Sequence, residues 1–213
     1  TGPVYALALC ETFATQDNAR MRGAAAAADV RVSLLGGFGA TIDGEPVSDH
    51  WRLRKARTLV KLLALAPGHR MHRDALVEMH WPDAEPAAAT NNLHQAVHAA
   101  RQVMGATRIG LGDDVLCLCP EDSLTVDAEA FEAAAIEARA SGDVGQLRQA
   151  LDRWTGSLLP EDEYEPWSTG TRDRLTEIRD AVTAQLAGRL VETGRPEAAL
   201  ALLEPLAAER PLD

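Results

Sequence analysis

Near Pro120 the sequence changes from a mixture of strand and helix patterns to helix patterns alone. Residues 30–119 contain short alternating apolar runs as well as longer runs whose apolar positions lie three and four apart. Residues 121–213 are rich in alanine and acidic side chains and carry only the helical spacing. The chain has 213 residues, of which 46% are hydrophobic, enough for a core in each part. We therefore expect an α+β fold, mainly α, built from two modules.

The first module, residues 30–120, shows the order of elements of a winged helix-turn-helix domain. Alternation over Val30-Arg-Val-Ser-Leu-Leu predicts a strand. A second strand is predicted at 38–42, and Asp43-Gly44 is typical of the tight turn of a hairpin. Three helical patterns and a closing hairpin follow, at 54–66, 73–80, 86–104 and 108–119. A sheet, three helices and a hairpin, in that order, are typical of a winged helix.

The second module, residues 121–213, is predicted to be all-α. Four helices are expected, at 128–140, 144–154, 166–193 with a break near Gly170, and 196–209. Small turns before Leu147 and Ala199 are followed by amphipathic helices at equal offsets, which is the pattern of stacked helical hairpins. We expect a tetratricopeptide-like domain that continues beyond residue 213.

Residues 1–29 show little regular patterning and are predicted to be a tail or linker with one helix over 4–15. The apolar stretch near the start is short and has no basic lead-in, unlike a signal peptide. No uninterrupted apolar run reaches the roughly 18 residues that a membrane-spanning helix needs. We expect a cytoplasmic protein with no membrane partner.

Charge is divided unequally between the two modules. The net charge is -11, yet residues 30–119 hold 10 basic against 9 acidic side chains, whereas residues 120–213 hold 9 against 20. All 6 histidines lie in the first module, so mild acidity adds positive charge there alone. The first module is therefore nearly neutral, and less basic than a typical nucleic-acid-binding domain.

The helix predicted at 86–104 has an outer face that is polar and free of acidic residues. Amide side chains such as Asn91 and Gln95 can bond bidentately to adenine, and Arg101 can bind guanine or a phosphate. A solvated helix surface has the same composition, so the pattern alone leaves both interpretations open. The residues predicted to read DNA bases are Asn91, His94, Gln95, His98, Arg101 and Gln102.

Basic side chains around the first two helices and the hairpin are candidates for contacts to DNA phosphates. They are Arg52, Arg54, Lys55, Arg57, Arg70, His72, Arg73 and Arg108. The expected tip of the hairpin is Asp113-Asp114, whose charges would repel phosphates.

The sequence has no pattern typical of an enzyme. No glycine-rich loop is followed by the Lys-Ser/Thr of a phosphate cradle. His94 and His98 lie one helical turn apart but lack the glutamate of a zinc-hydrolase helix. The acidic run 161–165 is predicted to be a solvated loop without chemistry. We predict no enzymatic activity, no metal and no cofactor. The three cysteines are expected to be small buried side chains rather than a disulfide framework: Cys10, Cys117 and Cys119.

The order of motifs resembles that of the SARP-type transcriptional regulators of actinobacteria. Asn91-Asn-Leu-His-Gln-Ala-Val-His is similar to the start of the family's recognition helix. Segments similar to the family's N-terminal part begin at Val30, Asp43, Arg54 and Arg73. Segments similar to its bacterial transcriptional activator domain are Val126-Asp-Ala-Glu-Ala-Phe, Glu165-Pro-Trp and Gly194-Arg-Pro-Glu-Ala-Ala-Leu. The similarity covers residues 30–213.

The resemblance implies a response-regulator-type winged helix whose third helix enters the major groove of promoter DNA at direct repeats. It also implies a helical domain that supports homodimer formation and contacts RNA polymerase, within a longer chain that carries further domains. The expected function is sequence-specific transcriptional activation. Two departures lower the expected affinity for DNA: Arg101 is the one arginine where the family has several, and the hairpin tip is acidic.

An alternative function is that of a protein-interaction or autoinhibitory docking module with weak or no DNA binding. The low basicity of the first module favours it. The acidic helical module would then supply the working surface, with aromatic anchors of the kind that dominate interface energetics. The candidate anchors, which core packing explains equally well, are Trp154, Tyr164 and Trp167.

Overall fold

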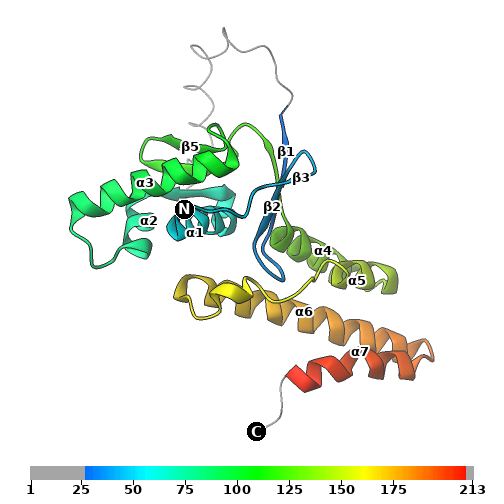
Figure 1. Cartoon of the computed structure of the whole chain (residues 1–213). Helices are drawn as coiled ribbons and strands as arrows, with labels where there is room; N and C mark the ends of the chain where they lie inside the picture. The colour runs from blue at the N-terminus through cyan, green and yellow to red at the C-terminus, as the bar shows by residue number, and fades with distance from the viewer. Residues whose placement is uncertain (1–26, 210–213) are drawn as a thin grey trace, which may run out of the picture.

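The computed structural model describes residues 27–209 and shows a winged-helix module beside a helical module (Figure 1). The fold is α+β and mainly helical, as the sequence predicts. The helix predicted over 4–15 and Cys10 lie outside the described residues.

A four-stranded sheet opens the fold, in the order β3–β2–β1–β7. Its strands are β1 at Asp29–Ser33, β2 at Gly39–Ile42, β3 at Glu45–Pro46 and β7 at Ser123–Val126. β1 pairs antiparallel with β2 and parallel with β7. The sequence pattern does not predict β7, which lies just beyond the predicted module boundary at residue 120, in the part expected to be all-α, and pairs beside β1 at the edge of the sheet.

The alternation predicted for the first strand is confirmed. Val30 and Val32 are buried in the core, whereas Arg31 between them is exposed. The predicted turn is also confirmed, because Asp43 and Gly44 adopt the positive φ values of 52° and 86° that a tight hairpin turn requires.

Three helices follow the sheet and confirm the predicted positions. They are α1 at Arg54–Leu65, α2 at Arg73–His80 and α3 at Pro86–Met104. Leu59 and Leu63 of α1 and Leu93 of α3 lie in the core. The helix α1 ends just before Pro67-Gly68, and a short 3-10 helix, Pro67–His69, follows it.

The wing is a second, three-stranded sheet in the order β4–β6–β5. Its hairpin, β5 at Ile109–Gly112 and β6 at Val115–Leu118, agrees with the one predicted over 108–119. β4, Arg70–His72, was not predicted, because three residues are too few for an alternating pattern to be visible. The strand pairs with β6 and so ties the wing to the start of α2.

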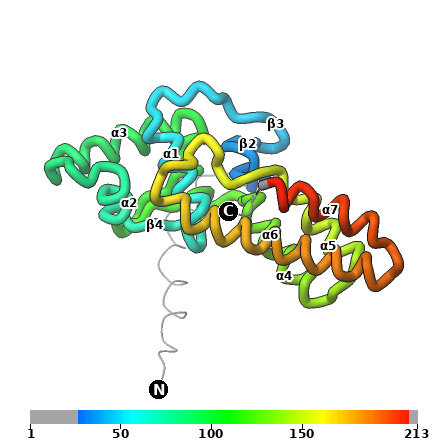
Figure 2. Tube along the Cα trace, turned by 90° about the horizontal axis from the view of Figure 1, so that it is seen from below, coloured from blue at the N-terminus to red at the C-terminus, as the bar shows by residue number. Residues whose placement is uncertain are grey.

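Two helical hairpins form the second module. α4 at Asp127–Ser141 packs with α5 at Val144–Leu151, and α6 at Pro166–Glu192 packs with α7 at Pro196–Glu209 (Figure 2). The break predicted near Gly170 is absent, since α6 runs through this exposed glycine as one helix. A 3-10 helix, Pro160–Asp162, lies in the connection between the two hairpins.

Backbone hydrogen bonds join the two modules. The N–H of Leu159 donates to the carbonyl of Leu34 at 2.8 Å, and the N–H of Gly36 donates to the carbonyl of Ser157 at 2.9 Å. The carboxylate of Asp127, at the start of α4, accepts the N–H groups of Leu34 and Leu35 at 2.7 and 3.0 Å. Buried side chains of both modules belong to one hydrophobic cluster. The winged helix is therefore fused to the helical module rather than tethered to it.

Candidate nucleic-acid interface

The helix α3 presents one face to the core and the opposite face to solvent. Pro86 begins the helix at a position where its missing N–H costs nothing, and Gly105, at a φ of 100°, ends it. Its buried side chains recur at helical spacing and include Leu93, Ala96, Val97, Ala100 and Met104. This stripe fixes the rotation of the helix, and so decides which side chains point outward.

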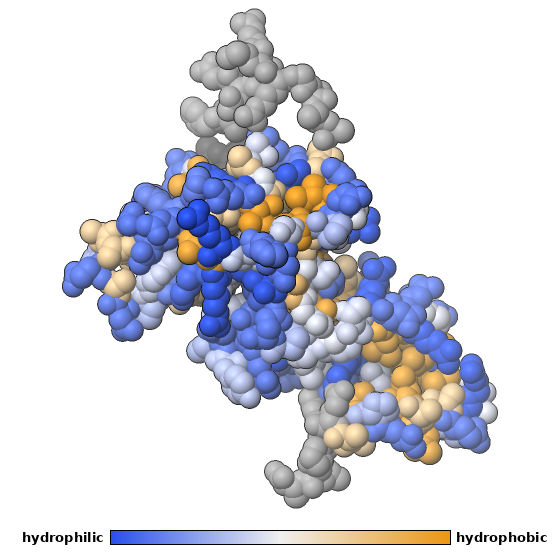
Figure 3. Space-filling model, in the orientation of Figure 1, coloured by the Kyte–Doolittle hydropathy of each residue, from blue (hydrophilic) through white to orange (hydrophobic). Residues whose placement is uncertain are grey.

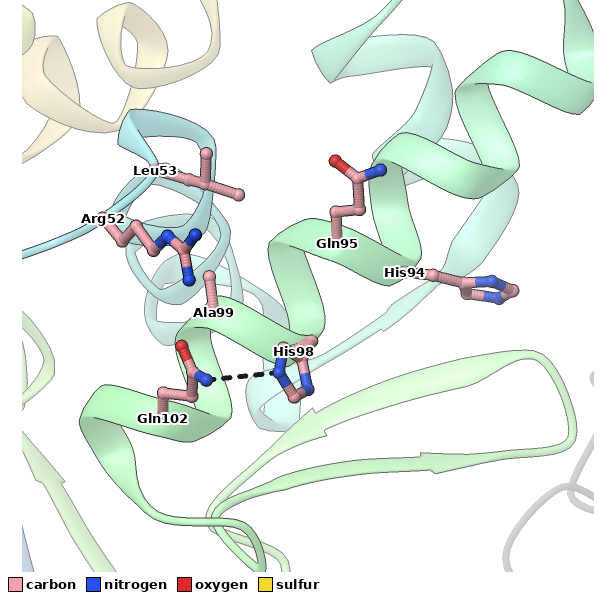
Figure 4. A pocket seen from close by; sticks show the side chains of 7 residues that line it. All are labelled: Arg52, Leu53, His94, Gln95, His98, Ala99 and Gln102. Atoms are coloured by element: carbon pink, nitrogen blue, oxygen red, sulfur yellow. Dashed lines mark hydrogen bonds between the residues drawn. The ribbon is translucent and has the colours of Figure 1, made fainter.

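The outward face holds five of the six residues predicted to read bases. These exposed residues are Asn91, His94, Gln95, His98 and Gln102. The side-chain amide of Gln102 lies 3.2 Å from the Nε2 atom of His98, one turn earlier (Figure 4). No acidic residue lies on α3, so this face carries donors and acceptors but no negative charge.

The sixth residue, Arg101, is placed differently. It is half-buried, and its Nε atom donates to the carbonyl of Ile109 in β5 at 2.9 Å. This contact holds β5, the first strand of the wing hairpin, against the end of α3. The sequence gives no signal for it, because the spacing of Arg101 along the helix also fits the outward row.

An open hollow of about 420 Å³ lies beside the outward face of α3. Figure 4 shows Arg52 and Leu53, from the segment before α1, across from the helix, with the side chain of Ala99 on the α3 side facing them. A smaller hollow of about 240 Å³ continues past Leu53 toward α2. The face is therefore flanked on one side by an arginine and a partly exposed leucine.

The wing tip is less negative than its sequence suggests. Asp113 and Asp114 both have positive φ, 50° and 60°, which aspartate tolerates better than most residues in a tight turn. Asp114 pairs with Arg73, whose guanidinium Nη1 lies 3.0 Å from the carboxylate and whose backbone N–H donates to the Asp114 carbonyl at 2.8 Å. The tip is thereby held against the start of α2, and Asp113 is left as its unpaired charge within the described residues.

Two arginines predicted to bind phosphate are paired with carboxylates instead. The Nη2 atom of Arg54 lies 3.3 Å from an oxygen of Glu165, in the helical module. The guanidinium of Arg57 lies 3.7 Å from oxygens of both Asp49 and Glu161. Both arginines lie on α1, and each shares its charge with acidic groups from other parts of the chain.

Lys55 and Arg108 are held in a similar way. The ammonium of Lys55 donates to the carbonyl of His80 at 2.8 Å, and Arg108 lies 3.0 Å from a carboxylate oxygen of Asp122. Arg108 is also half-buried, which leaves little of its charge at the surface.

Arg52 and Arg70 are exposed and have no partner within residues 27–209. His72 is also exposed, and its ring caps α2 by accepting the N–H of Asp74 at 3.3 Å. Of the basic side chains predicted to bind phosphate, these three are the most available, and they lie before α1 and at the β4–α2 junction.

The acidic run 161–165 was predicted to be a solvated loop, and this is wrong for its first two residues, Glu161 and Asp162. Lys61 of α1 is only 2% exposed and donates to Glu161 at 2.8 Å and to Asp162, which is itself buried. Glu161 also accepts the N–H of Phe38 at 3.1 Å. Partial burial raises the pKa of Glu161, but the hydrogen bond and charge of Lys61, together with backbone hydrogen bonds, outweigh it and bring that pKa below its usual value. The run is an ion-paired contact between the modules.

The three aromatic anchors of the alternative function lie in different environments. Trp154 packs edge-on against Phe131 at 5.1 Å between ring centroids and lies under the guanidinium of Arg179. Trp167 is half-buried near the junction of the modules. Tyr164 is 91% exposed. Packing therefore accounts for Trp154, and Tyr164 is the most accessible of the three.

Comparisons with known proteins agree with this architecture. Residues 126–213 match the family model described as bacterial transcriptional activator domain. The regulatory protein DnrI of Streptomyces peucetius is 29% identical over 201 residues, which cover 86% of this chain and 73% of DnrI. The chain therefore carries a bacterial transcriptional activator domain over residues 126–213 and is similar along most of its length to a regulator of the SARP type.

The fold of this chain is also found in a solved structure of Mycobacterium tuberculosis EmbR in complex with a low-affinity phosphopeptide. The TM-score is 0.71 at 24% identity, over 86% of this chain. The chain spans about half of EmbR, 51% of its length. Within residues 27–209, no helix is long and apolar enough to cross a bilayer.

Proposed function

We propose that this chain is a sequence-specific DNA-binding activator that reads the major groove with the outward face of α3. The observation that carries the proposal is the exposed row of amides and imidazoles on α3, free of acidic residues and beside the unpaired Arg52. Such side chains bond to base edges, and a helix of this size fits the major groove. The similarity to the regulatory protein DnrI and the match to the bacterial transcriptional activator domain support the same conclusion.

Within this proposal, Asn91 and Gln95 are the principal readers of bases, and His94, His98 and Gln102 extend the same surface. Arg101 positions the wing through its bond to the Ile109 carbonyl. Phosphate contacts come first from Arg52, Arg70 and His72, because their side chains are accessible.

The test of base reading is Asn91→Ala and Gln95→Ala, measured by fluorescence anisotropy on promoter duplexes and on random duplexes. Each variant should lose about 1 to 3 kcal/mol of discrimination, the value of a bidentate base contact, while salt-sensitive binding to random DNA remains. The matched control is Gln149→Ala, an exposed glutamine on α5. Equal losses on both kinds of duplex would remove Asn91 and Gln95 from the base-reading set.

The test of phosphate contact is the double variant Arg52→Ala, Arg70→Ala. Each lost phosphate contact should reduce the slope of log affinity against log salt concentration by about 0.9. The control is Arg31→Ala, an exposed arginine on β1 paired with Asp29. A slope equal to that of the wild type would exclude both arginines as phosphate contacts.

The second candidate is a docking module without DNA binding, and the pairing of Arg54 and Arg57 with acidic groups favours it. A mobility-shift titration with the upstream regions of neighbouring genes separates the two functions. We expect a retarded complex at low salt. Absence of any shift there would favour docking.

We also propose that the helical module contacts a second copy of the chain or RNA polymerase, as the SARP resemblance implies. Apolar side chains gather at the surface where α7 lies along α6 (Figure 3). The large apolar side chains that are exposed on these two helices are Val191, Leu200 and Leu203. Cross-linking of the chain to purified RNA polymerase tests the first partner, and the mass of the chain by light scattering tests the second copy.

Because β7 pairs with β1, we propose that the boundary between the modules follows residue 126.

A further inference from the structure

The basic side chains of α1 form one row that meets the acidic segment 161–165. Arg54, Arg57 and Lys61 are spaced three and four residues apart and so share a helix face. Their side chains are 79%, 30% and 3% exposed, so the row runs from open surface into the junction of the modules. The buried end is held by Glu161 and Asp162, and the exposed end meets Glu165.

Arg54, at the exposed end, borders two hollows. One is the hollow of about 240 Å³ that it shares with Asn92 and Gln95 of α3. The other, of about 150 Å³, it shares with Glu165 and Trp167 of the helical module. Its guanidinium therefore lies between the candidate DNA surface and the acidic segment. Rotation of the Arg54 side chain would bring the guanidinium toward one or the other.

We propose that Arg54 is shared between Glu165 and a DNA phosphate, so that the acidic segment competes with DNA for the winged helix. This inference rests on the proposed function. In the structure, which contains no DNA, the Nη2 atom of Arg54 lies 3.3 Å from a carboxylate oxygen of Glu165. On DNA the guanidinium exchanges between the carboxylate and a backbone phosphate beside α3, so that Glu165 withholds part of this phosphate contact from the wild-type complex.

The Arg54–Glu165 pair and the Arg54–phosphate pair are close enough in energy for Arg54 to exchange between them. Glu165 and Arg54 are both substantially exposed, and an exposed ion pair is weak. A phosphate contact gains from the release of condensed counterions, and this gain grows as the salt concentration falls. The Lys61 contacts, by contrast, are buried, so they keep the acidic segment in place while Arg54 moves. The competition therefore needs no separation of the modules.

The test compares Glu165→Gln with Glu163→Gln, each measured as the salt dependence of binding to one promoter duplex. Glu163 is exposed, and its carboxylate has no partner within residues 27–209, so E163Q removes the same charge without freeing Arg54. We expect E165Q to tighten binding about 2- to 5-fold at low salt and to make the salt slope steeper by up to about 0.9, the value of one whole phosphate contact. E163Q should leave the slope unchanged. Adding Arg54→Ala to E165Q should return the slope to the wild-type value.

The outcomes separate this inference from the proposed function. If the wild type binds no duplex at any salt concentration, the proposed function fails. If the wild type binds and E165Q and E163Q have the same slope, DNA binding stands and the competition is refuted. Thermal unfolding of both variants should match the wild type within a few degrees, because both carboxylates are accessible to solvent.

Discussion

Lys61 is a buried cation at the inner end of the basic row of α1, and both of its ion pairs are made with the other module. The residues on either side of it, Val60 and Leu62, are buried, and the ammonium reaches Glu161 and Asp162. Removing one partner of a buried ion pair leaves the others desolvated without compensation, and this costs about 3 to 5 kcal/mol.

We therefore expect Lys61→Met to lower the free energy of unfolding by about 3 to 5 kcal/mol, measured by urea denaturation at pH 7. Adding Glu161→Gln and Asp162→Asn should restore part of the loss, because the uncompensated charges disappear. Arg31→Met, at an exposed ion pair on β1, should change the free energy by less than about 0.5 kcal/mol. A Lys61→Met variant as stable as Arg31→Met would show that the buried pairs contribute nothing.

His80 makes stability depend on pH. Burial, and then the charge of Lys55, lower the pKa of this imidazole from 6.5 to about 4. Between these two values the unfolded chain binds a proton that the folded chain does not, so stability should fall as the pH drops from 6.5 toward 4. The full effect is about 3 kcal/mol.

Urea denaturation at pH 7.5 and pH 5 measures this dependence. His80→Leu should reduce the difference between the two pH values, because the buried group no longer titrates. His50→Leu, at an exposed position, is the control and should leave the difference as it is in the wild type. An unchanged pH dependence in His80→Leu would assign the effect to other groups.

At the scale of the elements, two glycines of the helical module should respond to the same substitution with opposite signs. Gly142 follows α4 with a φ of 66°, and an added Cβ would lie 2.7 Å from the guanidinium of Arg189. Gly188 lies inside α6 with open space around it. We expect Gly142→Ala to destabilise the protein by about 1 kcal/mol and Gly188→Ala to stabilise it by up to about 1 kcal/mol, measured by thermal unfolding. Changes of the same sign would contradict this account.

The elements that the sequence predicts are those whose pattern is long enough to repeat. The three helices of the winged module and the hairpin turns at Asp43-Gly44 and Asp113-Asp114 depend on local spacing and local backbone preference, and they are confirmed. β4 and β7 are short, and each exists because a distant strand pairs with it. Local pattern cannot reveal such pairing.

The same distinction applies to the candidate interface. The buried stripe of α3 predicts which side chains face outward, so Asn91, Gln95 and their neighbours could be found from spacing alone. The partners of Arg54, Arg57 and Arg101 could not, since they lie on other elements. Lys61 did carry a signal, because a lysine inside the run Leu59-Val60-Lys61-Leu62-Leu63 requires a buried acidic partner. The acidic run 161–165 was available to supply it.

For the whole molecule, the shared core and the bonds of Asp127 predict that the modules unfold together. Asp127→Ala removes the acceptor for two backbone N–H groups of the first module and should cost roughly 2 to 4 kcal/mol. In the wild type, circular dichroism and hydrogen exchange in each module should give coincident transitions in urea. Two separate transitions would show that the modules are independent.

The parallel pairing of β7 with β1 also limits how hybrid regulators can be made. A segment transplanted between relatives to change the target promoter would have to start before Asp29 and extend through Val126, so that both paired strands travel together. A graft that stopped at the end of the wing hairpin would pair a foreign β1 with a host β7, two strands whose side chains did not evolve together. The splice point, rather than the recognition helix, would then decide whether the hybrid folds.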